Sequence, residues 1–223
     1  MAIKAIAVDI DGTLTDERKV LSTRGVEALR RVQERGTTVC LVSGNVLPIA
    51  YGLKTYMGLD GPVVAENGGI VCHGTEVVEL FDITLPRKAL ELLKANMDVQ
   101  ELFTSRWRRT EVAVERWADM ERIKELLDGW ELTIERTGFA IHIMNAGDGK
   151  GLGVKKMAEL LGIDTEEIAA FGDSDNDVSM FRQCGFSVAV GNASAAAKAA
   201  ASHVSRKEHA EGVIEGLEML GLL

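Results

Sequence analysis

Short apolar stretches alternate with amphipathic stretches along most of this chain of 223 residues. The apolar stretches, such as Ile3 to Val8 and Thr37 to Val42, have the length of buried β-strands. The segment Ser22 to Arg35 carries apolar residues at a helical spacing and is followed by a glycine. This alternation predicts an α/β fold with a doubly wound (Rossmann-like) parallel sheet that is covered by helices on both faces.

The same pattern continues through the rest of the two outer thirds of the chain. Further helices are expected over 46–57, 152–161, 178–183, 193–201 and 211–220. Further strands are expected over 63–65, 70–72, 168–171 and 186–190. The segment Glu66-Asn-Gly-Gly69 carries the Asn-Gly signature of a hairpin, and this turn chemistry by itself accounts for Asn67.

The middle of the chain has a different order of elements. It predicts helices over 87–95 and 119–127 and strands over 111–115, 132–135 and 139–144, the last two forming an antiparallel pair. We therefore predict an α+β cap domain over 82–149, inserted into a catalytic core made of 1–81 and 150–223. Such insertions act as lids over the carboxyl ends of parallel strands, where ligands bind.

The charge of the chain limits its partners. Asp and Glu number 34 against 25 Lys and Arg, so the net charge is −9. This acidity disfavours nucleic acids and anionic membranes, which are themselves polyanions, and no apolar run approaches the roughly 18 residues of a membrane helix. Cys40, Cys72 and Cys184 are far apart and predict reduced thiols. We expect a cytoplasmic protein that acts on a small molecule; the sequence indicates no oligomeric state.

Two acidic segments follow predicted strands. Asp9 and Asp11 lie two residues apart at the end of the first strand, so they point to the same side. The segment Gly172-Asp-Ser-Asp-Asn-Asp177 follows a later strand. A calcium-binding helix–loop–helix also opens with D-x-D-x-D, but it needs Gly where this chain has Val178 and Glu where it has Cys184. The calcium motif is therefore excluded, whereas an ordinary polar turn remains an alternative for each segment alone.

Two further segments could bind phosphate. Lys150-Gly151 precedes a helix and combines an ammonium group with free backbone N–H groups. Ser43-Gly44-Asn45 follows the second strand and offers a hydroxyl and N–H donors. Each alone is equally typical of a surface lysine or a helix cap. Together with the two acidic segments, whose hard oxygen ligands suit Mg²⁺, they predict one crevice that binds a metal ion and a phosphate group.

These four segments, in this order, resemble the four motifs of the haloacid dehalogenase superfamily of phosphatases. The insertion between the second and third motifs resembles the cap of its Cof-type (class IIB) branch. Within that branch the chain is similar to the archaeal phosphoglycolate phosphatases, through its short length, Gly61-Pro-Val-Val-Ala-Glu-Asn-Gly-Gly69, Ser43-Gly-Asn45 and Gly138-Phe-Ala-Ile-His142. The resemblance covers nearly the whole chain.

The resemblance implies a role for each motif. Asp9 would be the nucleophile that forms an aspartyl phosphate, and Asp11 would be the general acid and base. The second and third motifs would bind the phosphoryl group through Ser43, Gly44 and Lys150, and Asn176 of the fourth would orient Lys150 or the phosphate. Mg²⁺ would be held by the Asp9 carboxylate, the Asp11 backbone carbonyl, Asp173 and, directly or through water, Asp177. Asn45 departs from many relatives, which have Arg there.

The expected activity is thus Mg²⁺-dependent hydrolysis of a small anionic phosphate ester, with 2-phosphoglycolate as the first choice. A sugar-phosphate phosphatase, a phosphomutase and a non-catalytic phosphate-binding module are the alternatives. Arg106, Arg108 and Arg109 are candidates for binding a substrate carboxylate from the cap, although a solvated surface is the favoured interpretation. His142 lies in a strand of alternating polarity, where a hydrogen-bonded sheet histidine is the favoured interpretation.

Overall fold

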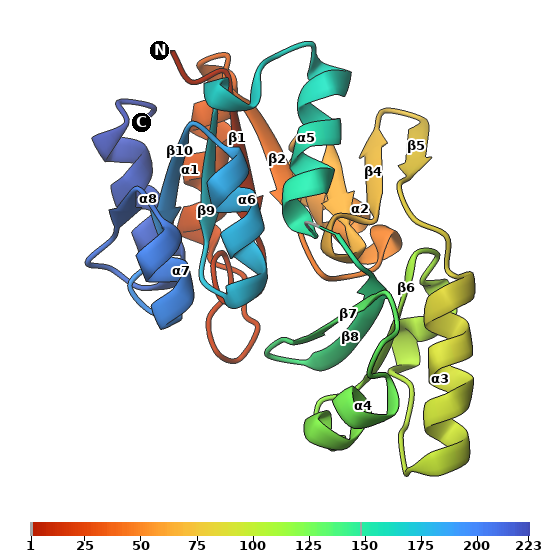
Figure 1. Ribbon diagram of the computed structural model, residues 1–223. Coiled ribbons are helices and arrows are strands. Elements are labelled where there is room, and N and C mark those ends of the chain that lie inside the picture. The colour runs from red at the N-terminus through yellow and green to blue at the C-terminus, as the bar shows by residue number, and fades with distance from the viewer. Residues whose placement is uncertain (1, 148) are drawn as a thin grey trace.

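The computed structural model describes residues 2–147 and 149–223 (Figure 1). An eight-stranded sheet forms the larger part, in the order β11-β10-β9-β1-β2-β3-β4-β5. Its strands are β1 (Ala5–Asp9), β2 (Thr38–Val42), β3 (Val63–Ala65), β4 (Ile70–His73), β5 (Glu76–Glu79), β9 (Ile168–Gly172), β10 (Phe186–Ala189) and β11 (His203–Val204). Six neighbouring strands are parallel, namely β11, β10, β9, β1, β2 and β3. Strands β4 and β5 add an antiparallel edge. The mostly parallel sheet predicted from the sequence is confirmed.

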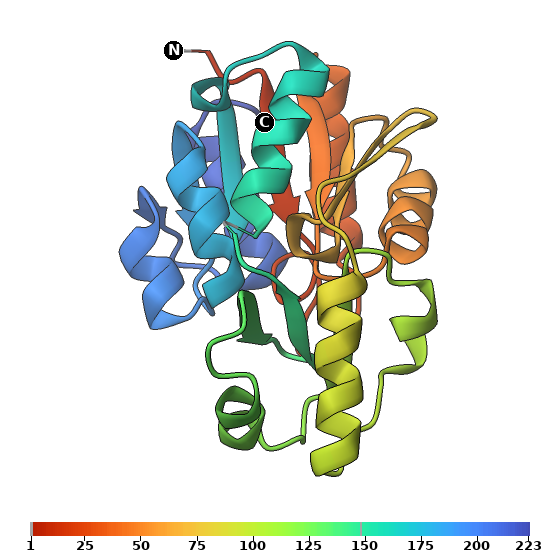
Figure 2. The same cartoon turned by 45° about the vertical axis from the view of Figure 1, so that its right-hand side comes forward.

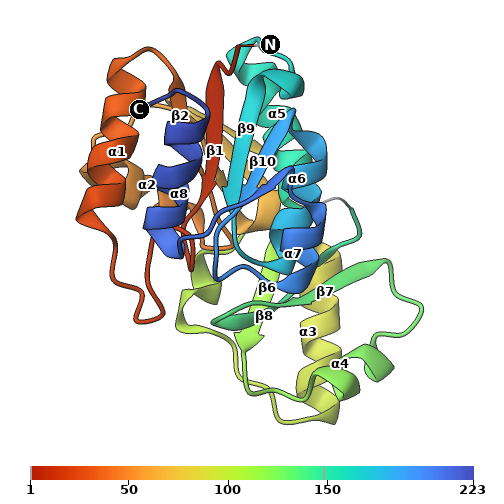
Figure 3. The ribbon, with the colours of Figure 1, turned by 90° about the vertical axis from the view of Figure 1, so that its left-hand side faces the viewer.

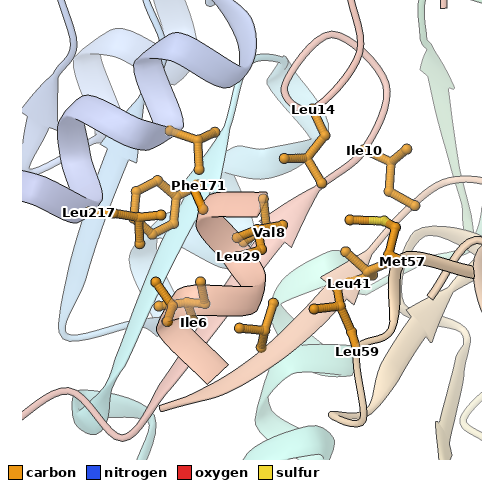
Figure 4. Packing of buried hydrophobic residues seen from close by; sticks show 14 of the residues in the cluster. Ile6, Val8, Ile10, Leu14, Leu29, Leu41, Met57, Leu59, Phe171 and Leu217 are labelled. Carbon is orange, nitrogen blue, oxygen red and sulfur yellow. The ribbon is translucent and has the colours of Figure 1, made fainter. Parts of the chain in front are cut away.

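Helices cover both faces of this sheet (Figures 1 and 3). One face packs against α1 (Thr23–Glu34), α2 (Leu47–Met57) and α8 (His209–Met219), through a cluster that includes Ile6, Val8, Leu29, Phe171 and Leu217 (Figure 4). The other face packs against α5 (Lys150–Leu161), α6 (Val178–Gln183) and α7 (Ala195–Ala200). Alternate residues of β1 supply the two faces, since Ala5 and Ala7 belong to the second cluster. The fold is therefore doubly wound.

The chain leaves the sheet after β5 and returns at α5, and the segment between them forms a separate layer (Figure 2). This layer contains α3 (Thr84–Asn96), β6 (Glu111–Glu115), α4 (Met120–Leu126), β7 (Leu132–Arg136) and β8 (Ala140–Asn145). Its three strands pair antiparallel in the order β6-β8-β7. A third apolar cluster joins α3 and α4 to this sheet. We call this layer the cap.

Several elements differ from the sequence expectations. The short edge strands β5 and β11 were not predicted, because four and two residues without a buried face give no clear pattern. Helix α5 begins at Lys150, two residues earlier than its apolar spacing indicated. The segment between β3 and β4 is a 3₁₀ turn over Glu66–Gly68, and both Glu66 and Asn67 have positive φ values. Among the described residues, no helix has the length and apolarity needed to cross a membrane.

Candidate active site

The two acidic segments meet at one edge of the larger sheet. Asp9 is the last residue of β1, and Asp173 follows directly after β9, which pairs with β1 in parallel. Parallel pairing places both carboxyl ends at the same edge, although 164 residues separate them along the chain. Lys150, at the start of α5, reaches the same point. The carboxyl edge of the sheet thus gathers the groups that three of the sequence motifs supply.

Lys150 lies buried between two carboxylates. Its Nζ atom is 2.6 Å from Asp9 Oδ1 and 2.6 Å from Asp177 Oδ1. Burial alone would lower the pKa of Lys150, but the charges of Asp177 and Asp9 outweigh burial and raise that pKa. Lys150 is therefore a permanent cation that is held in place on two sides.

The acidic cluster of Asp9, Asp173 and Asp177 carries more negative charge than Lys150 offsets. Oxygens of the three carboxylates lie within 4.8 Å of one another. Burial, followed by the charge of Asp177, raises the pKa of Asp173 to about 6, and burial also raises the pKa of Asp9. Asp9 Oδ2 is buried and has no hydrogen-bond partner among the residues that the structure describes. An uncommitted carboxylate oxygen beside two further carboxylates fits a small hard cation such as Mg²⁺.

The oxygens of Asp177 are already engaged. Its Oδ1 accepts from Lys150, and its Oδ2 accepts from the backbone N–H groups of Asp173 and Ser174, at 2.9 Å each. Asp173 instead has one oxygen bound by the Thr13 hydroxyl at 2.8 Å. Asp177 therefore shapes the loop and balances Lys150, which suits a metal contact through water better than a direct one.

Gly12 is required beside these carboxylates. Its φ is +91°, a region that side chains disfavour, and a Cβ atom there would collide with the carboxylate of Asp173. The side chains of Asn192 and His209 hold the Gly12 carbonyl oxygen, with contacts of 2.9 and 2.8 Å. The chain can thus turn directly after Asp11 and leave the acidic cluster accessible.

Asp11 has more contact with solvent than Asp9, with 24% of its side chain exposed. The amide nitrogen of Asn45 donates to Asp11 Oδ2 at 2.6 Å, and Lys19 Nζ lies 3.4 Å from Asp11 Oδ1. Asn45, the position that departs from many relatives, therefore orients the Asp11 carboxylate in this chain. Sequence patterns alone did not indicate this contact.

The second motif is placed less directly than the others. Ser43 is fully buried, and its hydroxyl accepts from the backbone N–H of Asn45 at 3.0 Å. Gly44 lines the cavity described below, whereas Ser43 and Asp177 lie behind its wall. Ser43 thus supports its own loop in this structure, and the loop presents Gly44 to the cavity.

Asn67, which turn chemistry explained adequately, is part of a polar chain from the core to the cap. Its Oδ1 accepts from Asn176 at 3.0 Å, and its Nδ2 donates to Glu111 Oε2 on β6 at 3.0 Å. Among the described residues, the side chain of Asn176 bonds to Asn67 and Ser174 and not to Lys150. Asn67 has a positive φ of 51°, a conformation that asparagine tolerates better than most residues.

Arg108, Glu111 and His142 form a second buried group of ionisable residues, which we call the junction cluster. Arg108 pairs with Glu111 and donates two hydrogen bonds of 3.1 Å to the Gly44 carbonyl oxygen. His142 Nδ1 lies 2.9 Å from Glu111 Oε1, and its Nε2 lies 3.2 Å from the Thr137 hydroxyl. Burial, then the charge of Arg108, lowers the pKa of His142 well below its usual value. The preferred interpretation of His142 as a hydrogen-bonded sheet histidine is confirmed.

A cavity of about 180 Å³ opens above the acidic cluster. The core supplies most of its wall, and the turn between β7 and β8 closes it from the cap side. The cap residues in the wall are Thr137, Gly138 and Phe139, and the predicted site residues in it are Asp9, Asp11, Gly44, Lys150, Asp173 and Asn176.

The three cap arginines do not line this cavity. Arg108 is buried in the junction cluster, so the favoured solvated-surface interpretation is wrong for this residue. Arg109 pairs with Glu79 on β5. Arg106 stacks on the rings of Phe103 and Trp107. The expectation that one of them contacts the substrate finds no support in this geometry, because their short segment turns toward the core–cap junction instead.

Comparison with known proteins agrees with this arrangement. The family model for haloacid dehalogenase-like hydrolases matches residues 6–106 and 110–217. The chain belongs to the haloacid dehalogenase-like hydrolase family. Within this family it is 41% identical to a phosphoglycolate phosphatase of Archaeoglobus fulgidus, over 99% of this chain and 98% of that protein. It is 38% identical to a phosphoglycolate phosphatase of Methanothermobacter thermautotrophicus, over 96% and 97%.

Solved structures of the family share the whole fold. A crystal structure from Thermoplasma acidophilum superimposes with a TM-score of 0.93 at 31% identity, over all of both chains. A sugar phosphatase of subclass IIB superimposes with a TM-score of 0.82 at 22% identity, over 99% of this chain and all of that one. The core sheet and its antiparallel cap therefore have the arrangement of a subclass IIB member.

Proposed function

We propose that this hydrolase is a Mg²⁺-dependent phosphatase that hydrolyses 2-phosphoglycolate to glycolate and phosphate. The observation that carries the phosphatase proposal is Asp9, whose Oδ1 is held by Lys150 while its Oδ2 has no partner. Lys150 orients one oxygen of this buried carboxylate for attack on phosphorus and leaves the other oxygen available to a metal ion. The substrate proposal is supported by the phosphoglycolate phosphatases to which the chain is similar.

In the first half of the proposed reaction, an Asp9 carboxylate oxygen attacks phosphorus. The bond between phosphorus and the ester oxygen breaks, and protonated Asp11 gives its proton to the departing alkoxide. Asn45 fixes the Asp11 carboxyl group for this transfer. Glycolate leaves, and an aspartyl phosphate remains on Asp9.

In the second half, a water molecule attacks the phosphorus of the aspartyl phosphate. Asp11, now ionised, takes a proton from that water, and the bond between phosphorus and the Asp9 oxygen breaks. Inorganic phosphate leaves, and both carboxyl groups return to their starting states. Lys150 and the backbone N–H group of Gly44 would bind the phosphoryl oxygens in both halves.

The residues proposed to hold Mg²⁺ are Asp9, the Asp11 backbone carbonyl, Asp173 and, through water, Asp177. When bound, Mg²⁺ would neutralise part of the charge on the carboxylates and the phosphoryl group, which otherwise repel each other. The free Asp9 oxygen supports this assignment, since it is a buried acceptor without a partner among the described residues. Burial and the charge of Asp177 raise the pKa of Asp173, and a bound cation would favour its ionised form.

Phosphate release from a panel of esters tests the proposal. The panel includes 2-phosphoglycolate, glucose 6-phosphate and 4-nitrophenyl phosphate, each with Mg²⁺ and with excess chelator. We expect the highest kcat/KM on phosphoglycolate and no turnover with chelator. A higher value on glucose 6-phosphate would favour a sugar phosphatase, isomerised ester would favour a mutase, and no release from any ester would leave only a binding module.

The covalent step has its own test. Rapid acid quenching of the Asp11→Asn variant during turnover, followed by peptide mass spectrometry, should show a phosphoryl group on the peptide that contains Asp9. The amide at position 11 can neither protonate a leaving group nor activate water. With 4-nitrophenyl phosphate, whose leaving group needs no proton, the intermediate should therefore form and accumulate. Turnover by the variant with an unmodified peptide at every time point would argue for direct attack by water.

A further inference from the structure

The wall of the cavity contains far more negative than positive charge. Five of its side chains are carboxylates, those of Asp9, Asp11, Asp16, Glu17 and Asp173. Among the described residues, its only cationic side chains are Lys19 and Lys150. Lys150 is enclosed by Asp9 and Asp177, directly beneath the position proposed for the phosphoryl group. A second anionic group on the same substrate would therefore have Lys19 as its cationic partner.

The loop that carries Lys19 is held by its own hydrogen bonds. Asp16 Oδ1 accepts from the backbone N–H groups of Arg18 and Val20, at 2.9 and 2.8 Å. The Lys19 N–H donates to the Asp16 carbonyl oxygen at 2.9 Å. Lys19 itself has a φ of +61°, which costs a side-chain-bearing residue about 1 kcal/mol. The turn thus holds Lys19 at its tip in a conformation that lysine seldom adopts.

The Lys19 ammonium group lies between the core and the cap. It is 3.4 Å from Asp11 Oδ1 on the core side and 4.2 Å from the ring centroid of Phe139 on the cap side. The side chain is 53% exposed, so the ammonium group can reorient toward a ligand without breaking a buried pair. A cation at this position can contact the part of a substrate that extends from Asp11 toward the β7–β8 turn.

We propose that Lys19 binds the carboxylate of the leaving group and thereby selects for phosphate esters of small hydroxy acids. This proposal rests on the phosphatase activity proposed above. Asp11 would protonate the ester oxygen of the leaving group, and that oxygen is two bonds away from the carboxylate carbon in phosphoglycolate. The contact between Lys19 and Asp11 therefore places the ammonium group beside the part of the substrate that carries this charge. Phe139 limits the space beyond it.

The contact between Lys19 and Asp11 gives an alternative role, in which Lys19 affects the reaction solely by stabilising the Asp11 carboxylate. The two roles predict different results. An effect through Asp11 alters the turnover of every alkyl phosphate ester, with or without a carboxylate, because an alkoxide leaving group needs a proton. An effect through the substrate carboxylate alters only esters that carry one, and it raises KM more than it lowers kcat.

The experiment compares Lys19→Met, Lys19→Arg and Arg18→Met with the wild type. Arg18 is the adjacent cation on the same loop, is exposed and does not line the cavity, so Arg18→Met is the matched control. The readout is the ratio of kcat/KM on phosphoglycolate to kcat/KM on ethyl phosphate, which lacks the carboxylate but has a leaving group that also needs a proton from Asp11. A charge-assisted contact corresponds to a fall in this ratio of about 10- to 100-fold for Lys19→Met. Lys19→Arg should keep most of the ratio, and Arg18→Met should keep all of it.

The binding of two phosphonates gives a readout that does not depend on the hydrolysis of phosphoglycolate. 3-Phosphonopropionate has the size and charge of phosphoglycolate, and propylphosphonate lacks only the carboxylate charge. As inhibitors of 4-nitrophenyl phosphate hydrolysis, the first should bind the wild type about 10- to 100-fold more tightly, and Lys19→Met should remove most of that difference. Equal binding of the two by the wild type, or an unchanged difference in Lys19→Met, would overturn the proposal.

These outcomes test the role of Lys19 separately from the proposed phosphoglycolate phosphatase function. A wild type that prefers phosphoglycolate, with the same preference in Lys19→Met, would overturn the role of Lys19 and leave the function intact. A wild type that hydrolyses sugar phosphates faster, yet binds 3-phosphonopropionate more tightly through Lys19, would contradict the phosphoglycolate assignment and support the role of Lys19.

Discussion

The acidic cluster and the junction cluster are both buried and both ionisable, but their charges are balanced differently. The acidic cluster sets three carboxylates against the one ammonium group of Lys150, and Asp9 Oδ2 has no partner. The junction cluster sets Arg108 against Glu111, with His142 neutral because its pKa is lowered. Its one unpartnered atom is Arg108 Nε, a donor.

This difference distinguishes a binding site from a structural joint. A buried charge without a partner costs several kcal/mol, so a protein retains one where a ligand completes the site. The junction cluster needs no ligand, since each of its charges already has an opposite or a hydrogen-bonded partner. It joins β6 and β8 of the cap to the Gly44 loop and to Asn67 of the core. Removing a charge from the acidic cluster should therefore lower activity, whereas removing a charge from the junction cluster should lower stability.

The largest effect is expected from Asp9→Asn. Loss of the nucleophile should lower kcat by about 10⁴-fold or more, because an amide is a poor nucleophile. Without metal, the variant should be at least as stable as the wild type, since one of the mutually repelling carboxylates is removed. Phosphate release and thermal unfolding measure the two effects, with the exposed Asp128→Asn as a control. A marked loss of stability in Asp9→Asn would contradict the comparison.

Breaking the junction pair should cost stability. Arg108→Met leaves Glu111 buried without its cation, and such a loss costs about 3–5 kcal/mol of the free energy of unfolding. The double variant Arg108→Met/Glu111→Gln should recover part of this cost, because no unpaired charge remains. Urea unfolding measures both. If the double variant were as unstable as the sum of the single variants, the two charges would not depend on each other.

Mg²⁺ should stabilise the protein through the acidic cluster only. At a Mg²⁺ concentration 100 times its Kd, binding adds about 2.7 kcal/mol to the free energy of unfolding. Asp9→Asn should lose most of this gain, whereas Arg108→Met should keep it. Thermal unfolding with Mg²⁺ and with chelator gives the difference. A gain of equal size in Asp9→Asn would place the metal elsewhere.

The smallest effect concerns pH at the junction cluster. Burial holds the pKa of His142 well below 6.5, so in acid the unfolded chain takes up a proton that the folded chain does not. Stability should therefore fall as pH drops below about 6.5, by about 1 kcal/mol between pH 7 and 5.5 from this residue. His142→Gln should remove that part of the slope in urea unfolding at the two pH values. An identical slope in both proteins would mean that His142 becomes protonated in the folded state.

Local patterns were sufficient to predict much of the fold. The strand over 111–115 and the helix over 178–183 were predicted with the bounds that the structure has. Buried strands and amphipathic helices carry their signal within one segment, so a single sequence contains it. The antiparallel pairing of β7 and β8 also followed from local signals, because a short turn joins them. The two short edge strands lack such a signal and were missed.

Long-range contacts set the limit of prediction at the site. Asp9, Asp11, Asp173 and Lys150 could be named because each ends a strand or begins a helix, and the fold class brings those ends together. Arg108, in contrast, was considered for the substrate, but its partners are Gly44 and Glu111. No local pattern indicates a partner 64 residues away.

The sequence by itself therefore determined the α/β class and the acidic strand ends, and its four motifs carried the resemblance to the family. The class and the strand ends follow from residue types at short spacings, where backbone geometry already fixes which side chains point the same way. Only the tertiary structure decided that Asn67 connects core and cap, that Asn45 holds Asp11, and that Lys19 lies at the cavity. These contacts depend on how separate segments pack, because the burial of a charge and its available partners are properties of the folded chain.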